Sequence, residues 1–421
     1  MDIFETKSYR LSRKLIVAEA AFEYLISILV TDAFLARLTT SLGFSDSLTG
    51  VLSAIASLGC IFQLASVLIR TRHIKKLVLC CTFVSELLFL LLYLVPMTGF
   101  SPKTRSMLFV LFLTLAYLSA MMVAAKKKNW FMSLVDDRKR GRFTAVTEFF
   151  SLAAGIAFSF VMGRVIDSSQ DGGNLNRGFM ICAAVVLLLL VLQMLSQVFS
   201  AEGPEPEDSA EVSIRDGIRS VVTDRTILSL TVFLVLYRVG VVTATSFYGT
   251  YQIRELGFSQ TLVVALTAAG RVVRMAFTPV MGRYADRCSF AKMERICLFF
   301  LMAGFIMAGA ATPANGRFFF ALYYVTNGIA MAGANSAMTN LIFDYVPTEK
   351  RSDALAVSQA VSGTAGFAAA LAAGSLVNRI QENGNCFLGM NVYAQQLTSL
   401  IAAVIMGICI VYINRKFIRK P

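Results

Sequence analysis

Twelve apolar windows, each long enough to cross a lipid bilayer as a helix, occupy most of this sequence of 421 residues. They are centred near residues 28, 58, 87, 117, 154, 189, 239, 271, 303, 330, 362 and 404. A spanning helix needs about 20 mostly apolar residues. The windows lack the alternating pattern of a membrane barrel. Because only helices and closed barrels can span a bilayer, the windows are expected to be helices. The sequence therefore predicts an all-α membrane protein with twelve transmembrane helices.

Composition supports this class and excludes a soluble one. Hydrophobic residues make up 56% of the chain and charged residues 15%, which is too apolar for one soluble core. The net charge of +13 could suggest nucleic acid, but its placement argues otherwise. When the loops are assigned alternately from an inner N-terminus, 28 of the 39 Lys and Arg lie inside and 7 outside. This positive-inside pattern places both termini in the cytoplasm, and the chain in the cell membrane without a nucleic-acid partner.

Cysteine and histidine usage gives no indication of a cofactor. The eight cysteines include a single one, Cys386, in an expected outer loop, so no disulfide framework is expected. The only histidine is His73, which leaves no Cys and His cluster for zinc. We expect neither a metal nor a cofactor.

The chain divides at its one long hydrophilic stretch. Residues 201–225 begin Ala-Glu-Gly-Pro-Glu-Pro-Glu-Asp and are too polar and proline-broken to enter a membrane. We expect a six-helix bundle over residues 1–200, a cytoplasmic linker over 201–225 and a second six-helix bundle over 226–421.

An internal repeat relates the two halves. Leu-Gly-Phe-Ser occurs at residues 42–45 and again at 256–259. At a slightly shorter offset, Gly155 matches Gly366 and Gly163 matches Gly374. With six spans per half, the two copies have the same orientation in the membrane. The sequence thus predicts two pseudo-symmetric bundles.

A charged turn in the second half completes the pattern. Gly282-Arg-Tyr-Ala-Asp286-Arg287 follows the eighth window. Twelve spans, a 6+6 repeat, a charged linker and this turn resemble the major facilitator superfamily along nearly the whole chain. The first-half turn at residues 70–76 lacks the family's glycine and aspartate. The resemblance implies a secondary transporter that alternates between outward-open and inward-open states. It also implies an inner gate formed by Gly282, Asp286 and Arg287, with Arg351 as the cationic neighbour of Asp286.

Charged side chains within the apolar windows are the candidates for function, because a charge at the bilayer centre is costly unless it is paired or wet. The solute candidates are Arg238, Arg271, Arg274, Tyr248 and Asn335. The proton-coupling candidates are Glu23, Glu19 and Glu148. Glu19 and Glu23 are four residues apart and share one helical face. The three arginines could instead be structural partners of these acids, and Lys126 to Lys128 could either reach lipid headgroups or line an inner vestibule.

These residues favour a transporter for an acid-bearing solute. Guanidinium groups bind carboxylate or phosphate in two-pronged geometry, and a buried carboxylate is suited to carrying a proton. Sodium coupling stays open, because carboxylate and hydroxyl oxygens also bind Na⁺. The alternatives are a multidrug or metabolite efflux antiporter and, from another class, a membrane enzyme or receptor. An enzyme would need a catalytic constellation, and none is seen. We expect a monomer.

Overall fold

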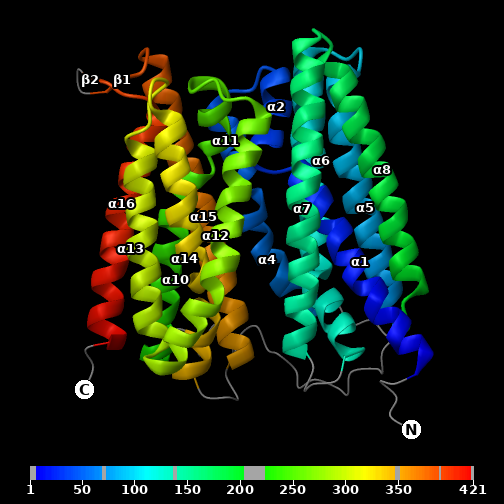
Figure 1. Cartoon of the computed structure of the whole chain (residues 1–421), viewed down its shortest axis with the longest axis vertical. Helices are drawn as coiled ribbons and strands as arrows, with labels where there is room; N and C mark the ends of the chain where they lie inside the picture. The colour runs from blue at the N-terminus through cyan, green and yellow to red at the C-terminus, as the bar shows by residue number, and fades with distance from the viewer. Residues whose placement is uncertain are drawn as a thin grey trace. The chain divides into compact units, whose positions relative to one another are not determined.

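The computed structural model describes residues 6–68, 73–135, 140–202, 223–346, 351–387 and 390–418, and these are almost entirely helical (Figure 1). Each of the twelve apolar windows is centred on a helix. Among the described residues, eight helical segments are long and apolar enough to cross a membrane. These segments are α5 with η2, α6, α7, α8, α10 with α11 and η4, α12, α15, and α16 with η6. The predicted all-α membrane fold is confirmed, and the full count of twelve spans stays a prediction.

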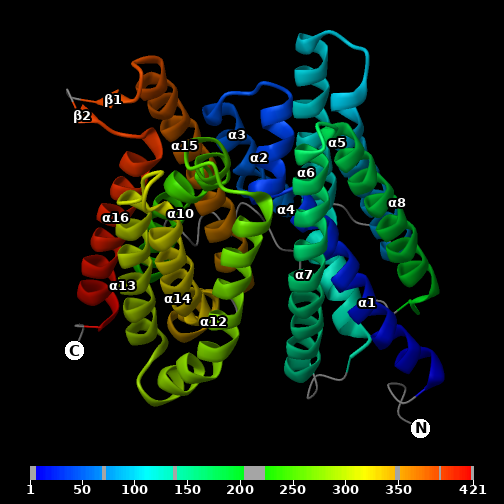
Figure 2. The same ribbon diagram turned by 45° about the horizontal axis from the view of Figure 1, so that its top comes forward.

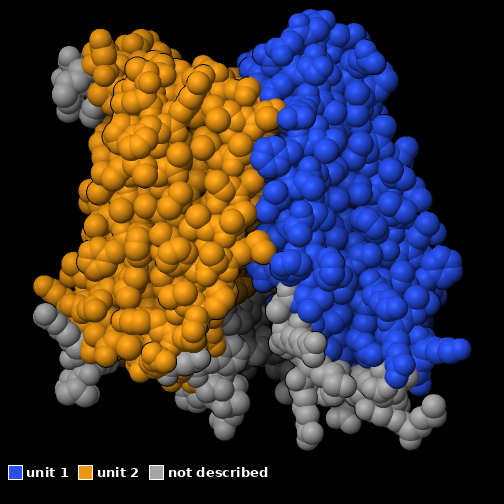
Figure 3. Space-filling model, in the orientation of Figure 1, with its two compact units in different colours: residues 1–44, 65–210 blue, residues 45–64, 211–421 orange. Residues whose placement is uncertain are grey.

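The helices form two compact units (Figure 3). Unit 1 comprises residues 1–44 and 65–210, and unit 2 comprises residues 45–64 and 211–421. The division does not fall at one point of the chain, because residues 45–64 from the first half pack within unit 2. Most of the expected linker, residues 203–222, lies outside the described residues.

Unit 1 is built around its first helix. Its helices are α1 (Lys7–Leu29), α2 (Asp32–Ser41), α5 (Ile74–Leu94), the short 3-10 helix η2 (Val95–Met97), α6 (Pro102–Ser133), α7 (Arg140–Asp171) and α8 (Leu175–Phe199). α1 packs against α7 and α8, and α5 packs against α6 and α8.

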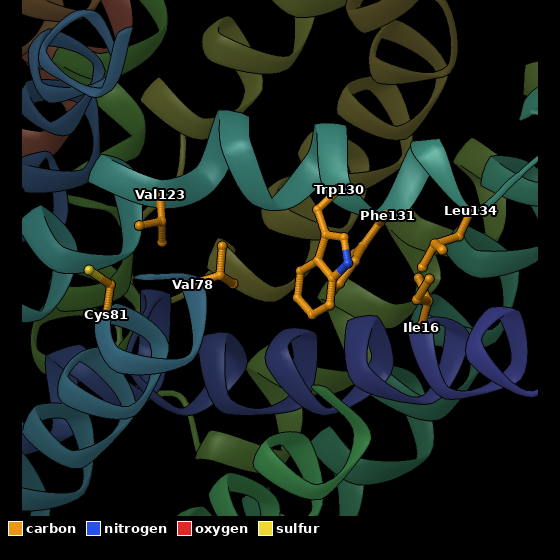
Figure 4. Close-up of a cluster of buried hydrophobic side chains, with 7 residues drawn as sticks. All are labelled: Ile16, Val78, Cys81, Val123, Trp130, Phe131 and Leu134. Atoms are coloured by element: carbon orange, nitrogen blue, oxygen red, sulfur yellow. The ribbon is translucent and has the colours of Figure 1, made fainter. Parts of the chain in front are cut away.

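One apolar cluster joins α1, α5 and α6 (Figure 4). Its buried members are Ile16, Val78, Cys81, Val123, Trp130, Phe131 and Leu134. Ala201 is fixed to the same region. Its carbonyl accepts a hydrogen bond from Trp130 Nε1 at 3.0 Å, and its amide donates to Ser12 Oγ at 2.8 Å. The chain therefore leaves unit 1 from a defined point.

Unit 2 contains the remaining elements, except that the last four residues of α4, 65–68, belong to unit 1. They are α3 (Asp46–Ser53), α4 (Ile55–Leu68), α10 (Arg225–Thr245), α11 (Tyr248–Thr250), the π-helix η4 (Tyr251–Glu255), α12 (Gln260–Arg287), α13 (Phe290–Gly309), α14 (Gly316–Tyr345), α15 (Arg351–Glu382), α16 (Ala394–Ile413) and the π-helix η6 (Asn414–Ile418). A two-stranded hairpin, β1 (Cys386–Phe387) with β2 (Met390–Asn391), connects α15 to α16 (Figure 2). α10 packs against α15 and α16, α13 packs against α14 and α16, and α3 lies along α15.

Glycines allow the close approach of α3 and α4 to α15. An ideal Cβ at Gly374 would lie 2.8 Å from Ser47 Oγ. One at Gly363 would lie 2.5 Å from the carbonyl oxygen of Ser57. A side chain at Gly363 would collide with this main-chain oxygen, so small residues on α15 serve helix packing.

The repeated tetrapeptide adopts the same structure twice. Gly43 and Gly257 both have positive φ, +74° and +65°, which ends the preceding helical segment at little steric cost. Ser45 then caps α3 by accepting from the Leu48 amide at 3.2 Å. Ser259 caps α12 by accepting from the Leu262 amide at 3.1 Å. The repeat therefore encodes one helix–turn–helix connection used in both halves.

Candidate functional site

A lysine shared by two carboxylates is the most strongly charged buried arrangement described in unit 1. Lys127 Nζ of α6 lies 2.5 Å from Glu19 Oε1 and 3.0 Å from Glu23 Oε2 of α1. The side chain of Glu19 is 1% exposed, whereas that of Glu23 is 49% exposed. Because the two acids lie four residues apart on one helical face, a single ammonium group reaches both. We call these three residues the Glu19–Lys127–Glu23 triad.

Polar side chains of α8 complete the surroundings of Glu19. Gln193 Nε2 and Gln197 Nε2 donate to Glu19 Oε1 at 3.1 and 2.8 Å. Lys127 also lies 5.7 Å from the centroid of the Phe131 ring, in cation–π geometry. These contacts hold the buried end of the triad in place and leave Glu23 as its accessible end.

The consecutive lysines of α6, residues 126–128, differ in their environments. Lys127 is buried in an ion pair with Glu19 and Glu23, whereas Lys128 is exposed. The sequence could not reveal this role, because it shows no contact between α6 and α1. The spacing of Glu19 and Glu23 was the available signal, since two neighbouring buried acids need a cation. Among the other acids, Glu86 of α5 is buried and Glu148 of α7 is exposed.

The first helical segment of the chain is interrupted after Glu23. α1 ends at Leu29 and α2 begins at Asp32, whose φ of +48° is left-handed. Tyr93 Oη donates to the Leu29 carbonyl at 2.5 Å, so this carbonyl, freed by the break, is satisfied by a side chain. An interruption of this kind frees main-chain groups, which neighbouring helices must then satisfy in a membrane protein.

The corresponding span of unit 2 is interrupted at the equivalent position. α10 ends at Thr245, and α11 and η4 continue after two residues. Tyr248 of α11 is buried, and its hydroxyl lies 3.0 Å from Ser399 Oγ of α16. Its ring packs edge-on against Phe320 and Tyr323 of α14. The structure thus places this solute candidate in the packing of the bundle.

Arg238 of α10 is half-buried and crosses α15 at a glycine. An ideal Cβ at Gly366 would lie 2.6 Å from Arg238 Cγ, so the absence of a side chain creates the groove in which the arginine stem lies. Arg271 and Arg274 are half-buried on α12, and Asn335 is exposed on α14. These four solute candidates are thus spread over three helices of unit 2 and differ in their exposure.

The expected inner gate lies partly outside the described residues. Gly282 and Arg287 are exposed at the end of α12. The side chains of Asp286 and Arg351 fall outside the described part. The gate therefore stays a prediction.

A second polar network, absent from the sequence-based candidates, surrounds Asp46 at the start of α3. Asp46 is 2% exposed, and its Oδ1 accepts from Arg254 at 2.7 Å. Its Oδ2 accepts from Gln381 Nε2 at 2.9 Å and from Gln395 Nε2 at 3.0 Å. We call these four residues the Asp46 network. It ties α3 to η4, α15 and α16 within unit 2.

Comparison with known proteins agrees with this fold. The sequence model of the Major Facilitator Superfamily matches residues 20–370 and 255–421. No curated protein sequence matches the chain significantly.

Solved structures show the same architecture at low identity. The nucleoside transporter NupG has a TM-score of 0.72 at 13% identity, covering 99% of this chain and 100% of that chain. The bacterial homologue of the human lysosomal transporter Spinster, inward-facing and unoccupied, has a TM-score of 0.68 at 11% identity, covering 100% and 98%. The D-xylose-proton symporter has a TM-score of 0.67 at 16% identity, covering 95% and 97%. At these identities the likeness concerns the fold. On the family match and the fold together, the chain belongs to the Major Facilitator Superfamily.

Proposed function

We propose that this protein is a proton-coupled secondary transporter that moves a small acid-bearing solute across the cell membrane by alternating access. The Glu19–Lys127–Glu23 triad carries the proposal. It combines a deeply buried acid, a shared cation and an accessible acid within one unit. The repeat-related halves, residues 1–200 and 226–421, are proposed as the bodies that move. The proposed moving bodies differ from the two compact units in residues 45–64, which belong to the first half of the chain and pack within unit 2.

The accessible carboxylate is the proposed proton carrier. With both acids ionised and Lys127 charged, the triad has one net negative charge, and a proton on Glu23 makes it neutral. Glu23 is half exposed while Glu19 is enclosed by Lys127, Gln193 and Gln197, so Glu23 is the group that a proton reaches first. An anion near the triad is then repelled less after Glu23 is protonated. Proton and solute binding favour each other in this scheme, and the coupling is reciprocal.

Arg238 is the proposed solute-binding cation. Among the three arginine candidates, it has its stem fixed in the groove at Gly366, which leaves the guanidinium at a defined height on α10. A guanidinium recognises a carboxylate or phosphate through paired hydrogen bonds. Arg271 and Arg274 on α12 are the other solute candidates in unit 2.

Transport into proteoliposomes tests the proposal. The purified chain is screened against organic acids, sugar acids, phosphate esters, neutral sugars, nucleosides and cationic drugs, and the best ligand is used as labelled solute. We expect the wild type to accumulate an acid under an imposed pH gradient. Glu23→Gln should retain solute exchange and lose uphill accumulation, because glutamine keeps the polar contact to Lys127 but cannot titrate. Lys128→Gln, which removes an exposed neighbour of Lys127, is the matched control.

Each part of the proposal has its own failing outcome. If Glu23→Gln accumulates solute as the wild type does, Glu23 is not the coupling group. If only a sodium gradient drives uptake, the coupling ion is wrong. A best ligand that is neutral or cationic would overturn the acid-bearing solute.

A further inference from the structure

A cavity on the surface of unit 2 has the chemistry of a phospholipid headgroup site. It has a volume of about 430 Å³ and lies between α13 and α16, which pack side by side (Figure 1). Its polar lining consists of Arg295, Asn414 and Arg415. Its apolar lining consists of Ile296, Phe299, Ile410 and Val411. No carboxylate contributes to this lining among the described residues.

Two of the apolar lining residues, Phe299 and Val411, are separated from the arginines along the helix axes. Arg295 precedes Phe299 by one turn near the start of α13, and Arg415 follows Val411 by one turn at the end of α16. Both arginines therefore lie toward the end of the bundle that carries the C-terminus. At 1.5 Å per residue, Phe299 and Val411 lie about 6 Å farther from that end than the arginines, whereas Ile296 directly follows Arg295. This is the order of a headgroup over an acyl chain.

The exposed apolar side chains identify the lipid-facing surface. Phe299 is 49% exposed and Val411 is 51% exposed. On a membrane-spanning bundle, large exposed hydrophobic side chains at this depth contact acyl chains. The apolar end of the cavity is therefore suited to an acyl chain.

Both guanidinium groups retain free hydrogen-bonding capacity. Arg295 Nη1 donates to Asn414 Oδ1 at 3.2 Å, which uses one of its five N–H donors. Arg415 is exposed at the start of η6. Glu294, the neighbour of Arg295, is fully buried and makes no hydrogen bond or ion pair with it within the described residues. The positive charge of the cavity is thus not cancelled by that acid.

The position of Arg415 is fixed from the other side of η6. Tyr345 Oη of α14 donates to the Phe417 carbonyl at 3.1 Å, and the two aromatic rings lie 5.1 Å apart, edge to face. These contacts hold η6 against the bundle, so Arg415 is presented at the cavity by a fixed element.

We propose that this cavity binds the phosphate-bearing headgroup of an anionic phospholipid such as phosphatidylglycerol, with the acyl chain along Phe299 and Val411. Basic pockets between membrane helices on the cytoplasmic side are suited to such headgroups. The separation of the two arginines from Phe299 and Val411 favours a lipid over a soluble phosphate, which has nothing to place against these apolar side chains.

Native mass spectrometry of the detergent-purified full chain tests the proposal. The protein is titrated with phosphatidylglycerol and, separately, with phosphatidylcholine of the same acyl chains. We expect preferential binding of phosphatidylglycerol. Arg295→Gln with Arg415→Gln should weaken it by about tenfold or more. The control removes two exposed basic residues of unit 1, Lys14→Gln with Lys76→Gln, and should change binding by less than about twofold.

Two further experiments distinguish lipid binding from binding of free phosphate and from nonspecific electrostatic attraction. Phe299→Ala with Val411→Ala should weaken lipid binding, and inorganic phosphate in large excess should fail to displace the lipid. Displacement by phosphate would show a soluble-anion site and overturn the proposal. Equal binding of phosphatidylcholine, or equal loss in the control variant, would do the same. If the double arginine variant is not monodisperse, Arg415→Gln alone carries the test, because its side chain is exposed.

Discussion

Arg238 lies in a groove of α15 that exists only because residue 366 is glycine. An ideal Cβ there would lie 2.6 Å from Arg238 Cγ. The same relationship occurs in unit 1, where a Cβ at Gly155 would lie 2.4 Å from Tyr24 Cε1. Gly155 and Gly366 are repeat partners, and Tyr24 and Arg238 correspond at the offset of the Leu-Gly-Phe-Ser copies. The two halves therefore share a contact geometry and differ in the side chain that uses it.

This contact predicts the effect of filling the groove. Gly366→Ala should displace the Arg238 stem and lower the affinity for an acid-bearing solute by about tenfold, since the guanidinium loses its paired geometry. Gly407→Ala on α16 is the control, because its ideal Cβ meets only Met302 Sδ at 3.8 Å. Solute binding is measured by isothermal titration calorimetry. Normal affinity in Gly366→Ala would remove Arg238 from the solute site.

The triad predicts that Lys127 contributes more to the free energy of unfolding than its neighbour Lys128. Lys127→Met leaves Glu19 buried without its cation and should cost about 3–5 kcal/mol. Lys128→Met should change little, because residue 128 is exposed. Combining Lys127→Met with Glu19→Gln should recover part of the loss, since the uncompensated charge is removed. Thermal unfolding in detergent measures all three. An unchanged melting temperature in Lys127→Met would contradict the ion pair.

The packing of α3 on α15 predicts a cross-link that stops transport. Cysteines introduced as Ser47→Cys and Gly374→Cys should form a disulfide on oxidation, because the ideal Cβ at residue 374 lies 2.8 Å from Ser47 Oγ. The bond would hold α3 in unit 2, and the proposed alternating cycle should then stop until a reductant is added. Each single cysteine variant serves as the control. Full transport by the oxidised pair would show that α3 does not leave α15 during the cycle.

Membrane orientation is tested by thiol labelling. Cys386 lies in β1 and Cys288 is exposed after α12. If both termini are cytoplasmic, an impermeant maleimide applied to intact cells should label Cys386 and reach Cys288 only after permeabilisation. Cys386→Ser should abolish labelling of intact cells. Labelling of Cys288 in intact cells would invert the proposed orientation.

Much of the fold was predictable because apolar length, charge asymmetry and repeats are local or periodic properties of a sequence. The Leu-Gly-Phe-Ser copies predicted a repeat, and Gly43 and Gly257 adopt the same left-handed conformation. The partners of buried charges were not predictable. Lys127 reaches Glu19 from another helix, and its neighbours Lys126 and Lys128 have the same chemistry. The sequence also did not show which helices pack together. α3 belongs to the first half of the chain, yet it packs against α15 of the second half.

The Asp46 network has a consequence for biogenesis. Asp46 and Gln395 are separated by 349 residues, so the ribosome has nearly finished translation before this hydrogen bond can form. Domains synthesised from the N-terminus usually complete their packing in order of emergence. Here α3 is synthesised early, and its aspartate must wait for Arg254, Gln381 and finally Gln395. During that interval the nascent chain has an acidic helix start with none of these partners, which is the stage at which insertion factors would be needed most.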